Sequence, residues 1–233
     1  MDGPDAVIFD LDGVLVDSEQ LWNAAKEALV RETGGRWRED APTVMMGMSS
    51  LEWAAYLRDE LGVPLDTEAI SREVVRRMLE GYRGGLPLLP GADQAVRALA
   101  ARWPLGLASS SNREVIDLVL ELADFGDLFR VAISSEEVAR GKPAPDVYLA
   151  VARELGADPA RCVAIEDSSN GLRAAAAARM AVIAVPNPHY PPAADALSLA
   201  AASVGSVGEI TPELVEQAAA GSSRRPSSRA RLE

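Results

Sequence analysis

Short apolar runs recur along this chain, and helix-like segments separate most of them. The runs are Ala6–Phe9, Leu105–Ala108, Val131–Ile133, Cys162–Ile165 and Ala181–Val185. The amphipathic segments are Ala92–Arg102, Glu114–Leu122, Asp146–Leu155 and Gly171–Ala178. Strands that alternate with helices are typical of a parallel sheet joined by right-handed crossovers. The pattern therefore predicts an α/β fold.

This alternation is interrupted after the first apolar run. No strand signal appears before Leu105, and the intervening sequence holds three helix candidates, Glu19–Thr33, Ser50–Leu61 and Thr67–Gly81. Such an insert is expected to form a cap over one edge of the sheet. We predict a Rossmann-like parallel sheet core with an inserted all-helical cap domain. The predicted division assigns residues 1–16 and 87–220 to the core, 17–86 to the cap and 221–233 to a disordered tail.

The charge balance limits the kinds of partner. The 233 residues carry a formal net charge of −12, and binding to nucleic acids or anionic membranes depends on basic surfaces, so we predict neither partner. The one cysteine, Cys162, excludes an intrachain disulfide framework. No basic leader is evident and no apolar run approaches the roughly 18 residues of a membrane span, so a cytoplasmic protein is predicted.

Polar side chains follow the apolar runs at the points where the predicted strands end. The carboxyl ends of parallel strands share one edge of a sheet, and ligands bind along that edge. A site that combines carboxylates, a hydroxyl and an ammonium group can handle a phosphate together with a divalent cation. The residues concerned are Asp10, Asp12, Ser109, Lys142, Glu166 and Asp167.

Asp10 and Asp12 stand at the end of the first run. Alternate side chains of an extended strand point the same way, so both carboxyl groups are expected to face one site. Asp10 is the candidate nucleophile, which forms an aspartyl-phosphate. Asp12 is the candidate acid and base, which protonates the leaving oxygen and then deprotonates the attacking water. The alternative is a solvated turn, but the apolar run before the pair and Gly13 after it favour the catalytic interpretation.

The acidic residues also predict a Mg²⁺ site. Carboxylates gathered at one edge repel each other by about 4 kcal/mol per close pair at an effective dielectric constant near 20. A hard cation with oxygen ligands relieves this repulsion. We assign Asp10, the backbone carbonyl of Asp12 and Asp167 as ligands. Glu166 either binds the metal directly or supports a ligand.

The remaining motif residues are candidates for phosphate binding. Lys142 stands between prolines in a stiff loop and is expected to neutralise phosphate oxygens. Ser109 is expected to donate to phosphate, with Ser110 and Ser111 beside it. Ser111 or Asn112 is expected to cap the helix that follows. In the cap, the candidate substrate contacts are Trp22, Gly47 and Ser50.

With these motifs in place, the chain resembles the haloacid dehalogenase superfamily over roughly residues 6–186. Within it, the chain is similar to the 2-deoxyglucose-6-phosphate and hexitol phosphatases, through Asp17–Trp22, Leu86–Gly91, Gly106–Ser111 and Ile165–Gly171. The resemblance implies a Mg²⁺-dependent phosphatase acting on a small phosphorylated sugar or polyol through an aspartyl-phosphate. We expect a small phosphorylated metabolite as the partner and a monomer or weak homodimer.

Other functions are less consistent with the motifs than a sugar or polyol phosphatase. The β-phosphoglucomutases have a similar cap, but they usually carry a histidine where Trp22 stands and an arginine about where Ser50 stands. The sequence shows no cationic cap residue that would bind a second phosphate or a carboxylate, with Arg58 the nearest candidate, which also disfavours a phosphoglycolate phosphatase. A phospho-receiver or interaction protein is disfavoured because such a protein needs neither Asp12 nor a cap.

Overall fold

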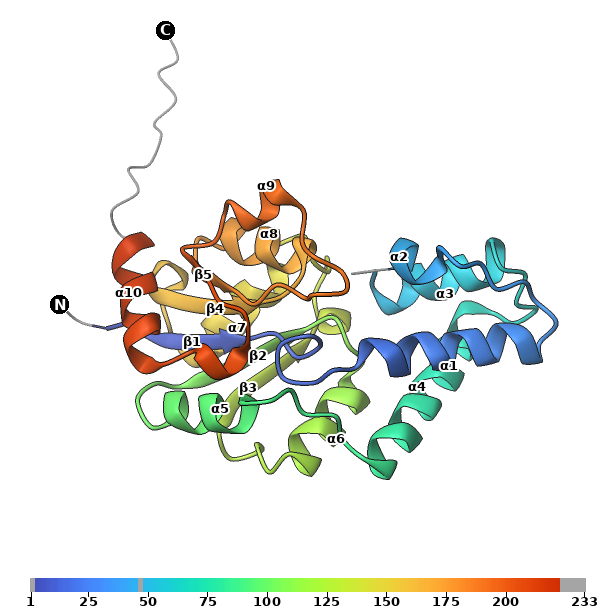
Figure 1. The fold of residues 1–233 in the computed structure, drawn as a ribbon, viewed down its shortest axis with the longest axis horizontal. Coiled ribbons are helices and arrows are strands. Elements are labelled where there is room, and N and C mark those ends of the chain that lie inside the picture. Colours follow the sequence, from blue (N-terminus) through green and yellow to red (C-terminus); the bar gives the residue numbers. More distant parts are fainter. Residues whose placement is uncertain (1–2, 46–47, 223–233) are drawn as a thin grey trace, which may run out of the picture.

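The computed structural model describes residues 3–45 and 48–222. Among these residues, six parallel strands form one sheet in the order β3-β2-β1-β4-β5-β6. Figure 1 shows this sheet and its helices as one lobe, with a helical lobe beyond the strand ends. The strands are β1 (Ala6–Phe9), β2 (Leu105–Ser109), β3 (Phe129–Ser134), β4 (Cys162–Glu166), β5 (Ala181–Ala184) and β6 (Ala202–Ser203).

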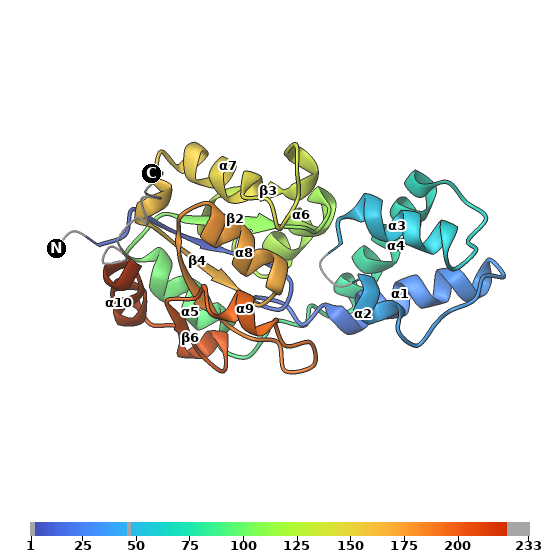
Figure 2. The same ribbon diagram turned by 90° about the horizontal axis from the view of Figure 1, so that it is seen from above.

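Helices cover both faces of the sheet (Figure 2). In β1, Val7 and Phe9 pack into the core on one face, whereas Ala6 and Ile8 pack into the core on the other. Because both faces are buried, the strands are continuously apolar. One face is covered by α5 (Ala92–Ala100), α6 (Arg113–Leu122) and α10 (Pro212–Ser222), and the other by α7 (Asp146–Leu155) and α8 (Ser169–Ala177).

The helical lobe lies opposite the carboxyl ends of the strands (Figure 1). Its described helices are α1 (Glu19–Glu32), α2 (Ala41–Met45), α3 (Ser50–Asp59) and α4 (Thr67–Gly84). The sequence predicted three of them and missed α2, because a five-residue helix is too short to show a periodic pattern. The fold class is the one predicted from the sequence, and the division at residues 17–86 stays a proposal.

Two chain segments connect the lobes and lie side by side. The amide of Asp17 donates to the carbonyl of Pro87 at 2.8 Å, and the amide of Leu89 donates to the carbonyl of Leu15 at 2.9 Å. These backbone hydrogen bonds join the segment that enters the cap to the one that leaves it. Any movement of the cap therefore acts on both connections together.

The C-terminal region differs from the prediction. Helix α10 continues through Ser222, two residues into the expected disordered tail, because the alanines at 218–220 favour helix. The rest of that predicted tail lies outside the described residues. The sequence also missed α9 (Ala194–Leu197) and β6, which are too short to be recognised. None of the described helices has the length and apolar character that a membrane span requires.

Candidate active site

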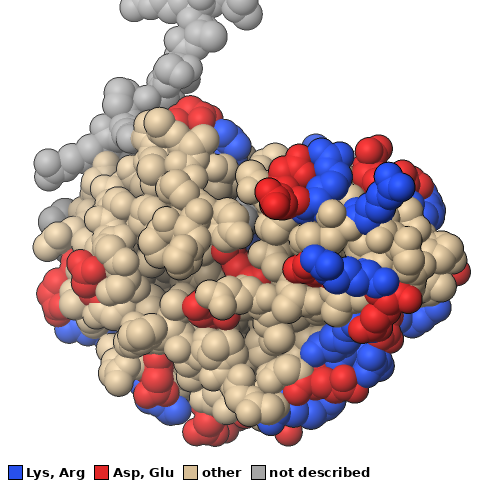
Figure 3. Space-filling view, turned by 45° about the vertical axis from the view of Figure 1, so that its right-hand side comes forward, with Lys and Arg blue, Asp and Glu red and all other residues tan. Residues whose placement is uncertain are grey.

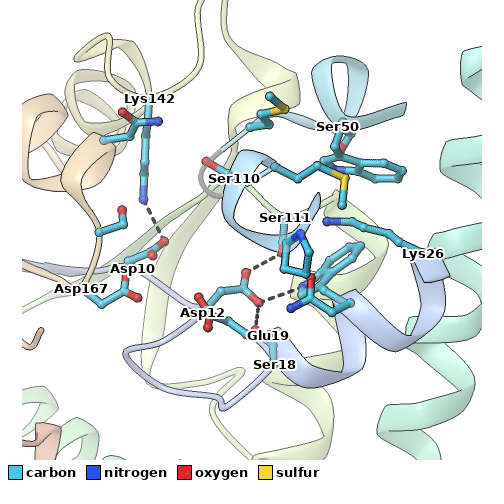
Figure 4. Close-up of a pocket in the computed structure, with 18 residues that line it drawn as sticks. Asp10, Asp12, Ser18, Glu19, Lys26, Ser50, Ser110, Ser111, Lys142 and Asp167 are labelled. Atoms are coloured by element: carbon cyan, nitrogen blue, oxygen red, sulfur yellow. Dashed lines mark hydrogen bonds and ion pairs between the residues drawn. The ribbon is translucent and has the colours of Figure 1, made fainter. Parts of the chain in front are cut away.

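The side chain of Lys142 links the ends of β1 and β4. Its ammonium group donates to Asp10 Oδ1 at 2.8 Å (Figure 4) and to Glu166 Oε1 at 2.6 Å. All three side chains are buried. Burial alone lowers the pKa of Lys142, but the charges of Asp10 and Glu166 outweigh it and raise the pKa above its ordinary value. Lys142 therefore stays cationic beside Asp10.

Glu166 is held by several fixed donors. Its Oε1 accepts hydrogen bonds from Lys142 and from the Tyr148 hydroxyl at 2.7 Å, and its Oε2 accepts from the amide of Asp167 at 3.1 Å. A Cβ on Gly171 would lie within 2.0 Å of the Glu166 carboxylate oxygens, so only glycine leaves room for this carboxylate. Both carboxylate oxygens of Glu166 thus have donors, and one of these donors is Lys142.

Asp10, Glu166 and Asp167 form a compact acidic cluster. One carboxylate oxygen from each lies within 4.8 Å of the others. Burial raises the pKa of Asp10 to about 7, with Lys142 opposing the increase and Glu166 adding to it. Burial and the neighbouring carboxylates also raise the pKa of Asp167. The donor set fits Mg²⁺, because hard oxygen ligands suit this ion and its charge would favour the ionised carboxylates.

Gly13 allows Asp167 to approach the loop after β1. Gly13 has a φ of 77°, and a Cβ there would meet Asp167 Oδ2 at 2.0 Å. A larger residue would therefore be strained in its backbone and would displace the carboxylate. Glycine at position 13 therefore leaves room for the Asp167 carboxylate of the acidic cluster.

Asp12 is held by donors from both lobes. The Ser111 hydroxyl, from the loop after β2, donates to Asp12 Oδ2 at 2.5 Å. The Ser18 hydroxyl and the Trp22 indole N–H, at the start of α1, donate to Asp12 Oδ1, the latter at 3.2 Å (Figure 4). The carboxyl group is thus oriented by the cap as well as by the core.

The three serines at the end of β2 and directly after it take different positions. Ser110 and Ser111 line the pocket. Ser109 is fully buried behind them, and its Oγ accepts a hydrogen bond from the Ser111 amide at 3.0 Å. Asn112 stands at the N-cap of α6, but its side chain makes no capping hydrogen bond. The predicted N-cap position is correct for Asn112, but no side-chain cap forms, because the Ser111 hydroxyl donates to Asp12 and the Asn112 side chain is hydrogen-bonded to Ser50 and Glu136.

The cap supplies the other wall of the pocket. Trp22 and Ser50 line it as predicted, but the Ser50 hydroxyl donates to Asn112 Oδ1 at 3.1 Å, so it joins cap to core. Asn112 in turn donates to Glu136 at 2.6 Å. Gly47 lies outside the described residues. Figure 3 shows acidic atoms in the hollow between the lobes, and basic and acidic groups are intermixed around it.

The sequence analysis missed Lys26 of α1. Its side chain reaches into the pocket and is only 7% exposed (Figure 4). Arg58, the cation that the sequence suggested, instead pairs with its neighbour Asp59 at the surface. The available signal was the four-residue spacing of Trp22 and Lys26, which places both on one side of a helix. The prediction that the cap has no cationic residue facing the substrate pocket was therefore wrong.

Comparison with known proteins agrees with this geometry. Residues 4–179 match the model of the haloacid dehalogenase-like hydrolases. Hexitol phosphatase B of Escherichia coli is 38% identical over 187 residues, which cover 78% of this chain and 84% of the relative.

Solved structures show the same fold. β-Phosphoglucomutase from Clostridium difficile superposes with a TM-score of 0.82 at 23% identity, covering 95% of this chain and all of the other. A mutant of CbbY from Rhodobacter sphaeroides, solved with xylulose-(1,5)bisphosphate, has a TM-score of 0.77 at 28% identity, covering 88% of this chain and 96% of that protein. The resemblance inferred from the motifs is confirmed, and this chain belongs to the haloacid dehalogenase-like hydrolase family.

Proposed function

We propose that this protein is a Mg²⁺-dependent phosphatase that hydrolyses a small phosphorylated sugar or polyol through an aspartyl-phosphate. One observation carries the proposal. The buried Asp10 carboxylate is fixed by Lys142 at the floor of a pocket that Asp12 also lines. A carboxylate nucleophile and a second carboxyl group for proton transfer are the two groups that this reaction requires of the protein.

The first half of the reaction transfers the phosphoryl group to Asp10. A carboxylate oxygen of Asp10 attacks phosphorus, and the bond between phosphorus and the ester oxygen of the substrate breaks. Asp12 gives its proton to that leaving oxygen, so the sugar departs as a neutral alcohol. Lys142 and the hydroxyl of Ser110 bind the phosphoryl oxygens.

The second half restores the enzyme. Asp12, now ionised, takes a proton from a water molecule as the water oxygen attacks phosphorus. The bond between phosphorus and Asp10 breaks, so phosphate leaves and the Asp10 carboxylate is regenerated. Asp10, Asp167 and the carbonyl of Asp12 would hold Mg²⁺, which neutralises charge on the phosphoryl oxygens when bound. Glu166 keeps Lys142 in place throughout.

The names of the relatives support a phosphorylated sugar or polyol as the substrate, and they indicate a phosphomutase as the alternative function. The named activity of the Escherichia coli relative is hydrolysis of hexitol phosphates, and CbbY was crystallised with a sugar bisphosphate. A phosphomutase must bind a second phosphate strongly. The cap has Trp22 and Ser50 at the positions where the mutases carry a histidine and an arginine, which favours hydrolysis.

We also propose that the protein acts in the cytoplasm as a monomer or weak homodimer, with neither nucleic acid nor membrane as a partner. The support for the last point is the net charge of −12 and the absence of a separate basic area on the face in Figure 3. Light scattering during size-exclusion chromatography measures the oligomeric state.

The direct test is a substrate panel. Purified protein with Mg²⁺ is assayed for phosphate release from phosphorylated hexoses, hexitols, sugar acids, glycolate and nucleotides. We expect the phosphates of sugars, polyols or sugar acids to have the highest kcat/KM, and Asp10→Asn protein prepared in the same way controls for contaminating phosphatases. Faster conversion of β-glucose 1-phosphate to glucose 6-phosphate than release of phosphate would show a mutase instead. A lead of tenfold or more for phosphoglycolate would reject the sugar assignment.

A further inference from the structure

Lys26 is a buried cation without an acidic partner in contact. Its Nζ lies 5.4 Å from the ring centroid of Trp22 and 5.0 Å from that of Trp53. Among the described residues it makes no ion pair and donates no hydrogen bond. Buried charges in proteins are ordinarily paired or hydrogen-bonded, because their desolvation is otherwise uncompensated. The indole faces compensate only part of this loss.

The surroundings of Lys26 separate the pocket into two ends. At the core end, the lining residues are the carboxylates, Lys142 and the serines. At the cap end, the pocket is lined by Lys26, by the apolar side chains of Trp22, Trp53, Met45 and Met48, and by the polar side chains of Glu19, Asn23 and Ser50. Of the described cap residues that line the pocket, Lys26 is the one that carries a positive charge. A substrate with its phosphate at Asp10 therefore extends toward this ammonium group.

The connection through Trp22 shows that the two ends are close. The Trp22 indole N–H bonds Asp12, and the same ring faces Lys26. Lys26 thus lies one indole ring away from the acid that protonates the leaving oxygen. Burial lowers the pKa of Lys26 to about 8, with the more distant charges of Asp12 and Glu19 opposing the decrease. The group is therefore largely cationic near neutral pH.

We propose that Lys26 binds a carboxylate at the end of the substrate opposite the phosphate, so that phosphorylated sugar acids are the class this pocket takes best. The assignment rests on the proposed phosphatase function and narrows its substrate class. A carboxylate matches a single ammonium group in charge. A second phosphate carries more charge and would need a second cation, and Lys26 is the one cationic side chain among the described cap residues that line the pocket.

The test compares two substrates that differ at one carbon. Gluconate 6-phosphate carries a carboxylate where glucitol 6-phosphate carries a hydroxymethyl group. Wild-type protein should prefer gluconate 6-phosphate in kcat/KM by about tenfold or more, the size of one charge-assisted hydrogen bond. Lys26→Met should remove this preference by lowering kcat/KM for gluconate 6-phosphate about tenfold more than for glucitol 6-phosphate or p-nitrophenyl phosphate, since neither of those substrates has a carboxylate.

Matched variants separate this role from a structural one. Arg58→Met removes a surface cation from the same cap and should keep the wild-type preference. If Lys26 only balanced the charge of Asp12, Lys26→Met would slow both sugar substrates and p-nitrophenyl phosphate alike, and that result would overturn the proposal. Lys26→Gln, which keeps a polar side chain, serves if the methionine variant does not fold.

A binding measurement tests the role of Lys26 independently of catalytic turnover. Calorimetry with Asp10→Asn protein should show tighter binding of gluconate 6-phosphate than of glucitol 6-phosphate. The double variant, which carries Lys26→Met as well as Asp10→Asn, should bind the two compounds equally. Equal affinities would overturn the proposal whether or not the wild-type protein hydrolyses either compound. A preference that depends on Lys26 but favours glucose 1,6-bisphosphate would equally overturn the assignment to a carboxylate.

Discussion

At the scale of single residues, the carboxyl group of Asp12 is shared between the two lobes. Ser111 holds one oxygen from the core, while Ser18 and Trp22 hold the other from the start of α1. In the proposed reaction Asp12 transfers a proton to the leaving oxygen, so the position of α1 would affect that step directly. A displaced cap would leave Asp12 with its core donor alone.

Trp22→Phe tests this shared positioning. The substitution removes the indole donor to Asp12 but keeps an aromatic ring beside Trp53 and Lys26. We expect kcat to fall by about tenfold, the equivalent of one hydrogen bond to a charged group, with a smaller change in KM. Trp53→Phe is the matched comparison, because Trp53 lines the same pocket without bonding Asp12. Equal losses in the two variants would show that only ring size matters.

The core half of the site is easier to predict from sequence than the cap half. Asp10 and Asp167 follow buried strands, and the carboxyl ends of parallel strands lie along one edge of a sheet. The sequence pattern therefore predicts that these two residues lie close together. Lys26 has no such constraint. Whether a helical lysine faces solvent or a pocket depends on how the cap packs on the core, and an isolated lysine is ordinarily exposed. The Ser50 contact with Asn112 crosses the lobes and was missed for the same reason.

At the scale of elements, the junction between β4 and α8 organises the site. Glu166 is the last residue of β4, and Ser168 caps α8 by accepting a hydrogen bond from the Gly171 amide at 3.0 Å. The first turn of α8 therefore lies against the Glu166 carboxylate. Helix α8 and Lys142 depend on the same buried carboxylate.

Gly171→Ala should disrupt this junction. The added methyl group would collide with Glu166 oxygens at 1.9–2.0 Å, which forces Glu166 away from Lys142. We expect a loss of about 2–4 kcal/mol in the free energy of unfolding, typical of overpacking combined with a broken buried network, and a large loss of activity. Urea denaturation measures the first and phosphate release the second.

Gly84→Ala is the control for that substitution. Gly84 ends α4, and a Cβ there would meet nothing within 4 Å. Alanine at this position should leave stability equal or slightly higher, since it reduces the entropy of the unfolded chain. If Gly171→Ala and Gly84→Ala changed stability and activity equally, close packing of Gly171 on Glu166 could not be the cause of the losses in Gly171→Ala.

The elements that the sequence missed are short or lie late in the chain. Helix α10 did have a local signal, because Thr211 precedes Pro212 and its hydroxyl accepts a hydrogen bond from the Leu214 amide at 3.3 Å. Proline at the first helical position after a capping threonine is a recognised start signal. Helix α2 carries a weaker signal, Pro42 in its first turn, and its five residues are stabilised by packing on α3.

At the scale of the whole molecule, Lys26 lowers stability in a way that depends on pH. Its pKa is about 8 in the folded protein and 10.5 when exposed. Between these values the unfolded chain binds a proton that the folded protein does not, so the free energy of unfolding rises with pH. Below pH 8 Lys26 is protonated in the folded and in the unfolded protein, and its burial as a cation lowers the free energy of unfolding by up to about 3 kcal/mol.

Lys26→Met should therefore be more stable than wild type near pH 7. The difference should shrink as the pH rises from 8 toward 10.5, because the wild-type protein regains stability over that window. Parallel urea titrations at several pH values measure the difference directly. A gap that stays constant over this range would show that Lys26 is not desolvated in the folded protein.

Metal binding should also stabilise the molecule as a whole. Asp10 and Asp167 are buried close together, and a cation bound only by the folded protein shifts the folding equilibrium toward it. At a hundredfold excess of Mg²⁺ over its dissociation constant the gain should be about 2.7 kcal/mol. Asp167→Asn should lose most of this response, as seen by thermal denaturation with and without chelator. An unchanged response in that variant would place the metal elsewhere.

In the proposed reaction Asp10 carries the phosphoryl group, and trapping the aspartyl-phosphate identifies the residue that does so. Turnover with a good substrate is quenched, the acyl phosphate is reduced with borohydride, and the peptides are sequenced by mass spectrometry. We expect conversion of residue 10 to homoserine, with more of it in Asp12→Ala protein because hydrolysis of the intermediate is then blocked. Asp10→Asn should give no label and no turnover. Label at another residue, or wild-type turnover by Asp10→Asn, would contradict the account.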